Sequence, residues 1–316
     1  MWRRAFGGLC VLLYTAAAHA LVALHTFPRD PAVSGVVVDT RPQADCVHSS
    51  LQGAICLAPQ EFLGPHGRLA SWRNIRWLLG ASGLSGSETV VVAGDNIDRE
   101  DFVAGVLYLA GQRHVEIVYR RLSRWLISHP HRAAAGLSHG VFRQAIYTAW
   151  PRTRLIILRQ ELGRLIRKGG SFDLMDGRPA DQYAGLRILA ARGGHIPGAQ
   201  PFTMSQALRT SMVGVPPSTR RVIAYDEDPY RSIAYFAQLR TLHMPAHVFV
   251  GGWQDWAAHT SFPVDDATYP VRVGAPLEVA RTAVGGFMAG DGRTVVAAAL
   301  AALVAGFVTI RFTRRS

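Results

Sequence analysis

The chain has 316 residues, 49% of them hydrophobic, and a formal net charge of +12 at pH 7. This length allows two domains of ordinary size. The positive charge favours acidic partner surfaces such as anionic lipid. However, the sequence has no zinc-finger spacing and no aromatic-basic signature, so we predict that it binds no nucleic acid. It also lacks a phosphate loop, a dinucleotide-binding glycine pattern and a serine-nucleophile elbow, and we predict neither a cofactor nor a metal ion.

The first twenty residues carry a targeting pattern. Arg3 and Arg4 precede a short apolar stretch, and small residues in an A-x-A pattern end at Ala20. This combination predicts a secretory signal peptide, residues 1–20, cleaved after Ala20. An uncleaved membrane anchor is the alternative.

Residues 21–127 are predicted to form a first α/β domain. Apolar runs predict buried strands at residues 36–38, 89–92 and 115–118, with a helix of one apolar face before the last strand. The order strand, helix, strand implies a parallel sheet with helices on its faces.

Two cysteines, Cys46 and Cys56, remain once Cys10 has left with the signal peptide. An oxidising compartment would permit a bridge between them. The spacing does not show whether the geometry fits, and we expect two separate thiols.

A second α/β domain is predicted at residues 154–260, after a linker at residues 128–153. It repeats the organisation of the first, with strands at 221–224 and 246–250. Both copies open with a strand that ends in Asp-x-Arg-Pro, beginning at Asp39 in the first and Asp176 in the second.

The C-terminal segment is predicted to anchor the protein. After a connector at residues 261–293, the uncharged residues 294–310 would rise about 26 Å as a helix, close to the thickness of a bilayer core. Arginines in the tail, residues 311–316, favour a cytoplasmic C-terminus. We therefore expect a single-pass protein of the cell inner membrane, with its body facing the periplasm or the outside. A buried core helix is the alternative.

The repeated pattern resembles the rhodanese family, specifically its two-domain sulfurtransferases. The resemblance covers residues 33–258 and implies two rhodanese-like domains, each a parallel sheet flanked by helices. Its strongest motifs lie in the second copy and read Asp176-Gly177-Arg178-Pro179, Gly194-His195-Ile196-Pro197-Gly198-Ala199 and Gly251-Gly252-Trp253-Gln254-Asp255-Trp256. The first copy is degenerate, because Ser49-Ser50-Leu51-Gln52-Gly53-Ala54 stands in place of the second of these motifs.

The resemblance also places the family's chemistry in the turn after the second strand, where a cysteine carries sulfane sulfur. Alignment on the closing arginines, Arg99 and Arg231, puts Gly94 and Asp226 at the cysteine position. A polarizable thiolate is needed for this transfer, and neither residue supplies one. We therefore expect that both turns are inactive.

The second turn departs further from the family pattern. It reads Asp226-Glu227-Asp228-Pro229-Tyr230-Arg231. Its three carboxylates repel an anionic sulfur donor, and its proline lacks one backbone N–H donor. Asp226 itself is interpreted as a charged plug that fills the turn's ring of N–H groups. A hard-cation site is a weaker alternative, because the acids lack the spacing of a calcium loop.

The remaining motif residues are interpreted as structural. Asp176 and Arg178 suit an ion pair at a strand end, and His195 suits a turn histidine bonded to backbone. Gly198 suits a position that needs a permissive backbone, and Trp253 suits core packing.

The sequence thus predicts a rhodanese-like tandem protein that serves as a non-catalytic binding or scaffold protein linked to sulfur metabolism or the cell envelope. Its partners would be the membrane and a periplasmic protein whose identity the sequence does not give. The alternative is an active sulfurtransferase, with thiosulfate or 3-mercaptopyruvate as donor, that uses a non-standard site. Cys46 and Cys56 are poor substitutes there, because they lie away from the turn in chain order.

Overall fold

The computed structural model describes residues 20–24, 35–140, 142, 144–213 and 220–265. Within these ranges no helix is long and apolar enough to cross a membrane. The predicted transmembrane segment, residues 294–310, lies outside the described residues, as does the predicted signal peptide up to residue 19.

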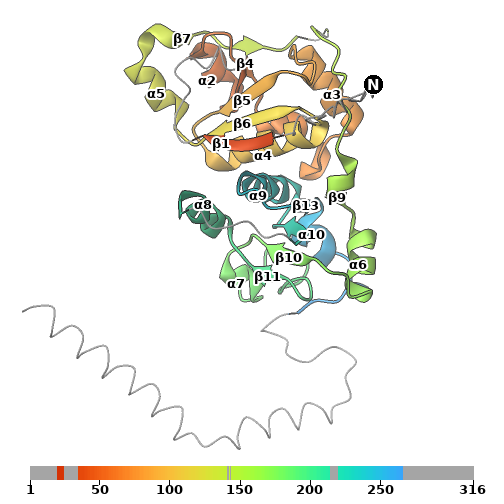
Figure 1. Cartoon of the computed structure of the whole chain (residues 1–316). Coiled ribbons are helices and arrows are strands. Elements are labelled where there is room, and N and C mark those ends of the chain that lie inside the picture. Colours follow the sequence, from red (N-terminus) through yellow and green to blue (C-terminus); the bar gives the residue numbers. More distant parts are fainter. Residues whose placement is uncertain (1–19, 25–34, 141, 143, 214–219, 266–316) are drawn as a thin grey trace, which may run out of the picture. The chain divides into compact units, whose positions relative to one another are not determined.

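The first sheet consists of parallel strands in the order β1-β6-β5-β2-β4-β8 (Figure 1). Val90 and Val92 of β5 belong to one buried cluster, whereas Val91 packs into another on the opposite face of the sheet. A valine-rich run buried on both faces is typical of a parallel sheet. The strands in sheet order are β1 (Ala20–Leu24), β6 (His114–Val118), β5 (Thr89–Ala93), β2 (Val36–Asp39), β4 (Ile55–Cys56) and β8 (Leu137–Ser138).

Helices and short antiparallel strands surround this sheet. The helices are α2 (Gln43–His48), α3 (Trp72–Ala81), α4 (Ile97–Ala110) and α5 (Leu122–Ser128). Strand β3 (Ser50–Leu51) pairs with β7 (Ala133–Ala134). Segment 128–153, which the sequence presents as a linker, therefore contributes β7 and the outer strand β8 of the first sheet.

The second sheet is also parallel, in the order β11-β10-β12-β13-β9. Its strands are β11 (Gln200–Pro201), β10 (Asp173–Asp176), β12 (Val222–Tyr225), β13 (Ala246–Phe249) and β9 (Ile156–Ile157). Its helices are α6 (Arg159–Arg167), α7 (Ala180–Tyr183), α8 (Met204–Val213), α9 (Pro229–Thr241) and α10 (Gly252–Ala257). The predicted α/β class with helix-flanked parallel sheets is confirmed.

Helices α4 and α9, one from each half, pack against each other. Residues 100–110 of α4 are all buried, because one side of the helix covers its own sheet and the other side meets α9. Phe102 stacks on Tyr230 with the ring centroids 4.5 Å apart. The Gln238 amide donates to Oδ2 of the buried Asp101 at 2.6 Å, and the Tyr119 hydroxyl donates to Oδ1 at 2.6 Å. The two sheets therefore share one apolar cluster, with a hydrogen-bonded carboxyl inside it.

Cys46 and Cys56 form a disulfide, with their Cα atoms 5.8 Å apart. The expectation of two separate thiols is wrong. Helix α2, which carries Cys46, turns back over β4, which carries Cys56, and both residues become fully buried. A Cα separation of this size suits a bridge, and only the folded chain reveals it.

We expect the disulfide to stabilise the first sheet. A double substitution of Cys46→Ser and Cys56→Ser should lower the free energy of unfolding by about 2 to 3 kcal/mol, because the unfolded chain regains the entropy of a short closed loop. Denaturant unfolding of the wild type with and without reductant should show the same difference. Two free thiols in the unreduced native protein, together with no effect of reductant, would contradict this expectation.

Candidate functional site

Asp176 and Arg178 form a buried ion pair where β10 ends. Arg178 Nε lies 3.0 Å from Asp176 Oδ1 and Nη2 lies 2.7 Å from Oδ2. Asp39 and Arg41 form the same fork after β2, with Arg41 Nη2 2.7 Å from Asp39 Oδ2. The bidentate geometry satisfies both charges inside the protein, which is the condition for tolerating them there.

Arg178 also joins the other motifs of the second half. Its Nη2 donates to the carbonyl of Gly194 at 2.7 Å. Its guanidinium lies 4.5 Å from the ring centroid of Trp253. Nη1 is 3.8 Å from Glu227 Oε2, so the same side chain reaches the turn in which the family's chemistry is expected. The Arg178 guanidinium is therefore surrounded by two carboxylates, a carbonyl and an aromatic ring of the protein.

His195, Gly198 and Trp253 occupy structural positions. The His195 ring stacks on Tyr183 with centroids 3.8 Å apart, and its Nδ1 hydrogen-bonds the Tyr183 carbonyl at 2.9 Å. Gly198 has φ +78°, a conformation that glycine adopts readily. Trp253 is buried, and its indole N–H donates to the Arg192 carbonyl at 3.1 Å.

The second turn connects β12 to α9 and is held from two directions. Asp228 caps α9, because its Oδ1 accepts the backbone N–H of Arg231 at 2.9 Å, and Pro229 takes the first helical position. On the other side, the backbone N–H of Trp253 donates to the carbonyl of Asp226 at 2.8 Å. The start of α10 therefore clamps the turn.

Asp226 is fully buried at the head of this turn. Its Oδ1 accepts the backbone N–H of Glu227 at 2.6 Å and Nε of Arg231 at 3.1 Å, but Oδ2 has no hydrogen-bond partner. Burial raises the pKa of Asp226 to about 6, and Arg231 opposes that shift without cancelling it. One oxygen of Asp226 thus accepts a single backbone N–H of the turn. The carboxylate therefore satisfies fewer N–H groups than the predicted plug would.

Glu227 and Arg231 complete the electrostatics of the turn. Burial raises the pKa of Glu227, although Arg178 favours its charged form, and its Oε1 has no hydrogen-bond partner. Arg231 binds Asp226 and also lies 3.5 Å from Asp98 of the first half. The arginine that closes the turn is therefore already paired with carboxylates of the protein. Two buried carboxyl groups and a paired arginine disfavour an anionic ligand.

The first turn, after β5, has no room for a side chain at its head. A Cβ added to Gly94 would lie 2.3 Å from Thr40 Oγ1 and 3.1 Å from Glu100 Oε1. Asn96 caps α4, because its side chain accepts the backbone N–H of Arg99 at 3.1 Å. The side chains of Thr40 and Glu100 occupy the head of this turn, whereas the Asp226 side chain lies at the head of the second turn.

Glu100 and Asp101 are polar residues of this region that the sequence interpretation missed. Burial, together with Asp101, raises the pKa of Glu100 to about 8, and burial also raises the pKa of Asp101 to about 8. Two adjacent acids directly before the apolar run of residues 102–110 were the signal that could have revealed them. Among the described residues no group of three or more His, Cys, Asp or Glu side chains is arranged to hold a metal ion.

Comparisons with known proteins find a rhodanese-like domain in the second half of the chain. Residues 158–259 match the model of the rhodanese-like domain. The thiosulfate sulfurtransferase of Azotobacter vinelandii is 30% identical over 121 residues, which cover 33% of this chain and 43% of that protein. The thiosulfate sulfurtransferase of Pseudomonas aeruginosa is 30% identical over 113 residues, which cover 30% of this chain and 41% of that protein. The chain thus matches less than half the length of either relative.

Solved structures show the same fold over a longer stretch. The crystal structure of a probable thiosulfate sulfurtransferase aligns with a TM-score of 0.55 and 22% identity over 76% of this chain and 99% of its own. An anaerobic ergothioneine biosynthesis enzyme from Chlorobium limicola, in complex with trimethyl histidine, aligns with a TM-score of 0.59 and 15% identity over 73% of this chain and 64% of its own. At these identities the likeness concerns the fold alone. The domain model and the sequence matches show that residues 158–259 are similar to the rhodanese-like domain.

Proposed function

We propose that this protein is a tandem rhodanese-like protein without sulfurtransferase activity, which serves as a binding or scaffold protein. One observation carries the proposal: Asp226, which the motif alignment puts at the family's nucleophile position, is a fully buried carboxyl group. A carboxylate cannot form the persulfide that sulfur transfer requires, because only a polarizable thiolate does so. The rhodanese scaffold around it is nevertheless intact.

The tandem arrangement has two kinds of support. Each half has its own parallel sheet, and in each an Asp-Arg fork follows the strand that opens the repeat. The probable thiosulfate sulfurtransferase noted above is covered over nearly its whole length by this chain. We therefore propose two rhodanese-like domains, the first of them degenerate.

The alternative, an active enzyme with a non-standard thiol, has less support. The described residues contain two cysteines, Cys46 and Cys56, and both are buried in a disulfide. A disulfide sulfur is not a thiolate and cannot attack a sulfur donor. The disulfide between Cys46 and Cys56 therefore favours the non-catalytic proposal.

We further propose export and membrane anchoring, on the sequence features at both ends. Cleavage after Ala20 would leave residues 21–24 of β1 paired in parallel with β6. A buried disulfide also suits an oxidising compartment outside the cytoplasm. The partner of such a protein would be met in the periplasm.

Sulfur transfer tests the proposal directly. The full chain in neutral detergent should show no transfer from thiosulfate or 3-mercaptopyruvate to cyanide. Asp226→Cys should gain measurable transfer, because its thiol would stand at the head of an otherwise intact turn. Adding Glu227→Gln should raise that activity several-fold, since a buried group that would repel an anionic donor is removed.

The matched control is Gly94→Cys in the first turn. It should stay silent, because Thr40 and Glu100 occupy the space that its side chain needs. Turnover by the wild type would overturn the proposal. Silence of the Asp226→Cys variant, despite a folded protein, would show that more than the nucleophile is missing.

The raised pKa of Asp226 predicts a pH-dependent stability. Because its folded-state pKa of about 6 lies above the ordinary value of 3.8, folding takes up a proton between these values. The group therefore destabilises the fold above about pH 6, by about 2 to 3 kcal/mol, and this penalty disappears as the pH falls below about 4. Asp226→Asn should be more stable than the wild type near pH 8, and the difference should shrink towards pH 4.

Denaturant unfolding of both proteins across this range measures the difference. A variant that is less stable than the wild type near pH 8 would contradict the expectation. It would instead favour the charged plug, held by Arg231 and the N–H of Glu227.

A further inference from the structure

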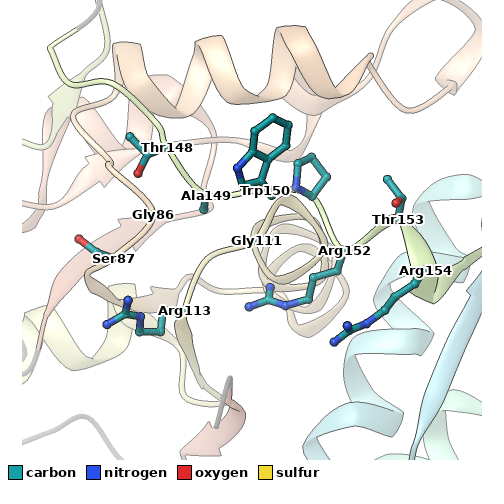
Figure 2. A pocket seen from close by; sticks show the side chains of 11 residues that line it. Gly86, Ser87, Gly111, Arg113, Thr148, Ala149, Trp150, Arg152, Thr153 and Arg154 are labelled. Carbon is teal, nitrogen blue, oxygen red and sulfur yellow. The ribbon is translucent and has the colours of Figure 1, made fainter. Parts of the chain in front are cut away.

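A cleft of about 510 Å³ lies beside the N-terminal ends of β5 and β6. The first turn, which begins at Gly94, follows the C-terminal end of β5. Its walls come from the loop before β5, the loop between α4 and β6, and the segment 148–154 (Figure 2). These loops precede the parallel strands β5 and β6, whereas Gly94 follows β5. The cleft is therefore a separate site from the turn described above.

Three arginines line this cleft: Arg113, Arg152 and Arg154. No Asp or Glu is among its eleven lining residues, and the hydroxyl groups of Ser87, Thr148 and Thr153 add hydrogen-bonding capacity. Figure 2 shows the three arginine side chains on one side of the segment and Trp150 on the other. The lining is thus cationic and rich in donors, which suits an anion.

Arg152 is fixed in place by the protein. Its Nη1 donates to the Tyr108 carbonyl, its Nη2 donates to the Gln112 carbonyl at 2.9 Å, and its guanidinium lies 4.3 Å from the ring centroid of Tyr108. Burial lowers the pKa of Arg152, and the positive charges of Arg240 and Arg154 lower it further. The cluster is therefore self-repulsive, and a bound anion would relieve that repulsion.

Arg113 and Arg154 differ from Arg152, because both are exposed. Among the residues that the structure describes, neither has a carboxylate oxygen within 4 Å. Glu88, which follows the loop before β5, is not among the lining residues, and its carboxylate accepts the backbone N–H groups of Ser85 and Gly86 at 2.8 and 3.0 Å. The two exposed guanidinium groups thus have charge and donors to offer a ligand.

The floor of the cleft is preformed. A Cβ added to Gly111, which has φ +108°, would lie 2.4 Å from the Trp150 carbonyl oxygen. The N–H of Arg152 donates to the Leu109 carbonyl at 2.7 Å. Segment 148–154 is therefore held directly against the end of α4, so little ordering is needed before a ligand binds.

We propose that this cleft is a binding site for a phosphate-type oxyanion. A phosphate group offers several oxygens and up to two negative charges, which matches planar guanidinium donors better than a single carboxylate does. The group could arrive as free phosphate, as a soluble phosphomonoester or as the phosphodiester of a lipid head group. The proposal stands whether or not the protein transfers sulfur.

Calorimetric titration of the full chain in neutral detergent, at low ionic strength, tests the site. Three probes separate the sources: inorganic phosphate, glycerol 3-phosphate and the head-group diester glycerophosphoglycerol. Saturable binding of at least one probe is expected. The double variant Arg113→Ala with Arg154→Ala should weaken it by about tenfold or more, because two charge-assisted hydrogen-bonding groups are lost.

The matched control is Arg124→Ala with Arg187→Ala, which removes the same charge from exposed positions outside the cleft. It should change the affinity by less than about twofold at a given ionic strength. Tightest binding of the diester would indicate a lipid head group, and tightest binding of the other probes a soluble ligand. Absence of binding for all three probes, or an equal loss in the control, would overturn the proposal.

Discussion

The guanidinium of Arg178 is the contact on which the second half of the molecule depends. It neutralises Asp176 at the end of β10, holds the carbonyl of Gly194, lies over the ring of Trp253 and faces Glu227. Removal of one partner from such a buried pair costs about 3 to 5 kcal/mol, because an unpaired charge is left inside. One charged side chain therefore contacts the rhodanese-like motifs of the second half. These motifs stabilise the fold whether or not the protein is catalytic.

On the proposed function, this dependence explains how a rhodanese-like scaffold persists without a cysteine nucleophile. Asp226 has no contact with Arg178 among the hydrogen bonds and ion pairs of the described residues, and it binds Arg231 instead. The residue at the head of the turn can therefore differ without disturbing the Asp176–Arg178 ion pair that stabilises the fold. The first half shows the same independence. Asp39 and Arg41 form their ion pair although Gly94, at the head of the turn, supplies no side chain. The residue at the head of each turn is therefore not part of the Asp-Arg ion pair of its own half.

The sequence predicted the features that rest on local pattern. The valine-rich strands, the parallel α/β class and the family followed from short apolar runs and from motifs in fixed order. Other features depend on distant residues meeting. Spacing could not fix the bridge between Cys46 and Cys56, and β8 has two residues, too few for a periodic signal. Arg113 and Arg154 converge although forty-one positions separate them, so no motif marked the cationic cleft. Asp226 was found, but its unpartnered Oδ2 follows from three-dimensional packing.

On the proposed function, no residue of the native protein accepts sulfane sulfur. Intact-mass measurement of the protein as exported, after incubation with thiosulfate and without reductant, is the sharpest test, because it detects covalent transfer even when turnover is slow. The mass of the protein processed after Ala20, which has lost Cys10, should remain unchanged, since Asp226 cannot form a persulfide and Cys46 and Cys56 are bridged. A mass gain of one sulfur atom, removed by cyanide, would contradict the claim and identify a working sulfur carrier.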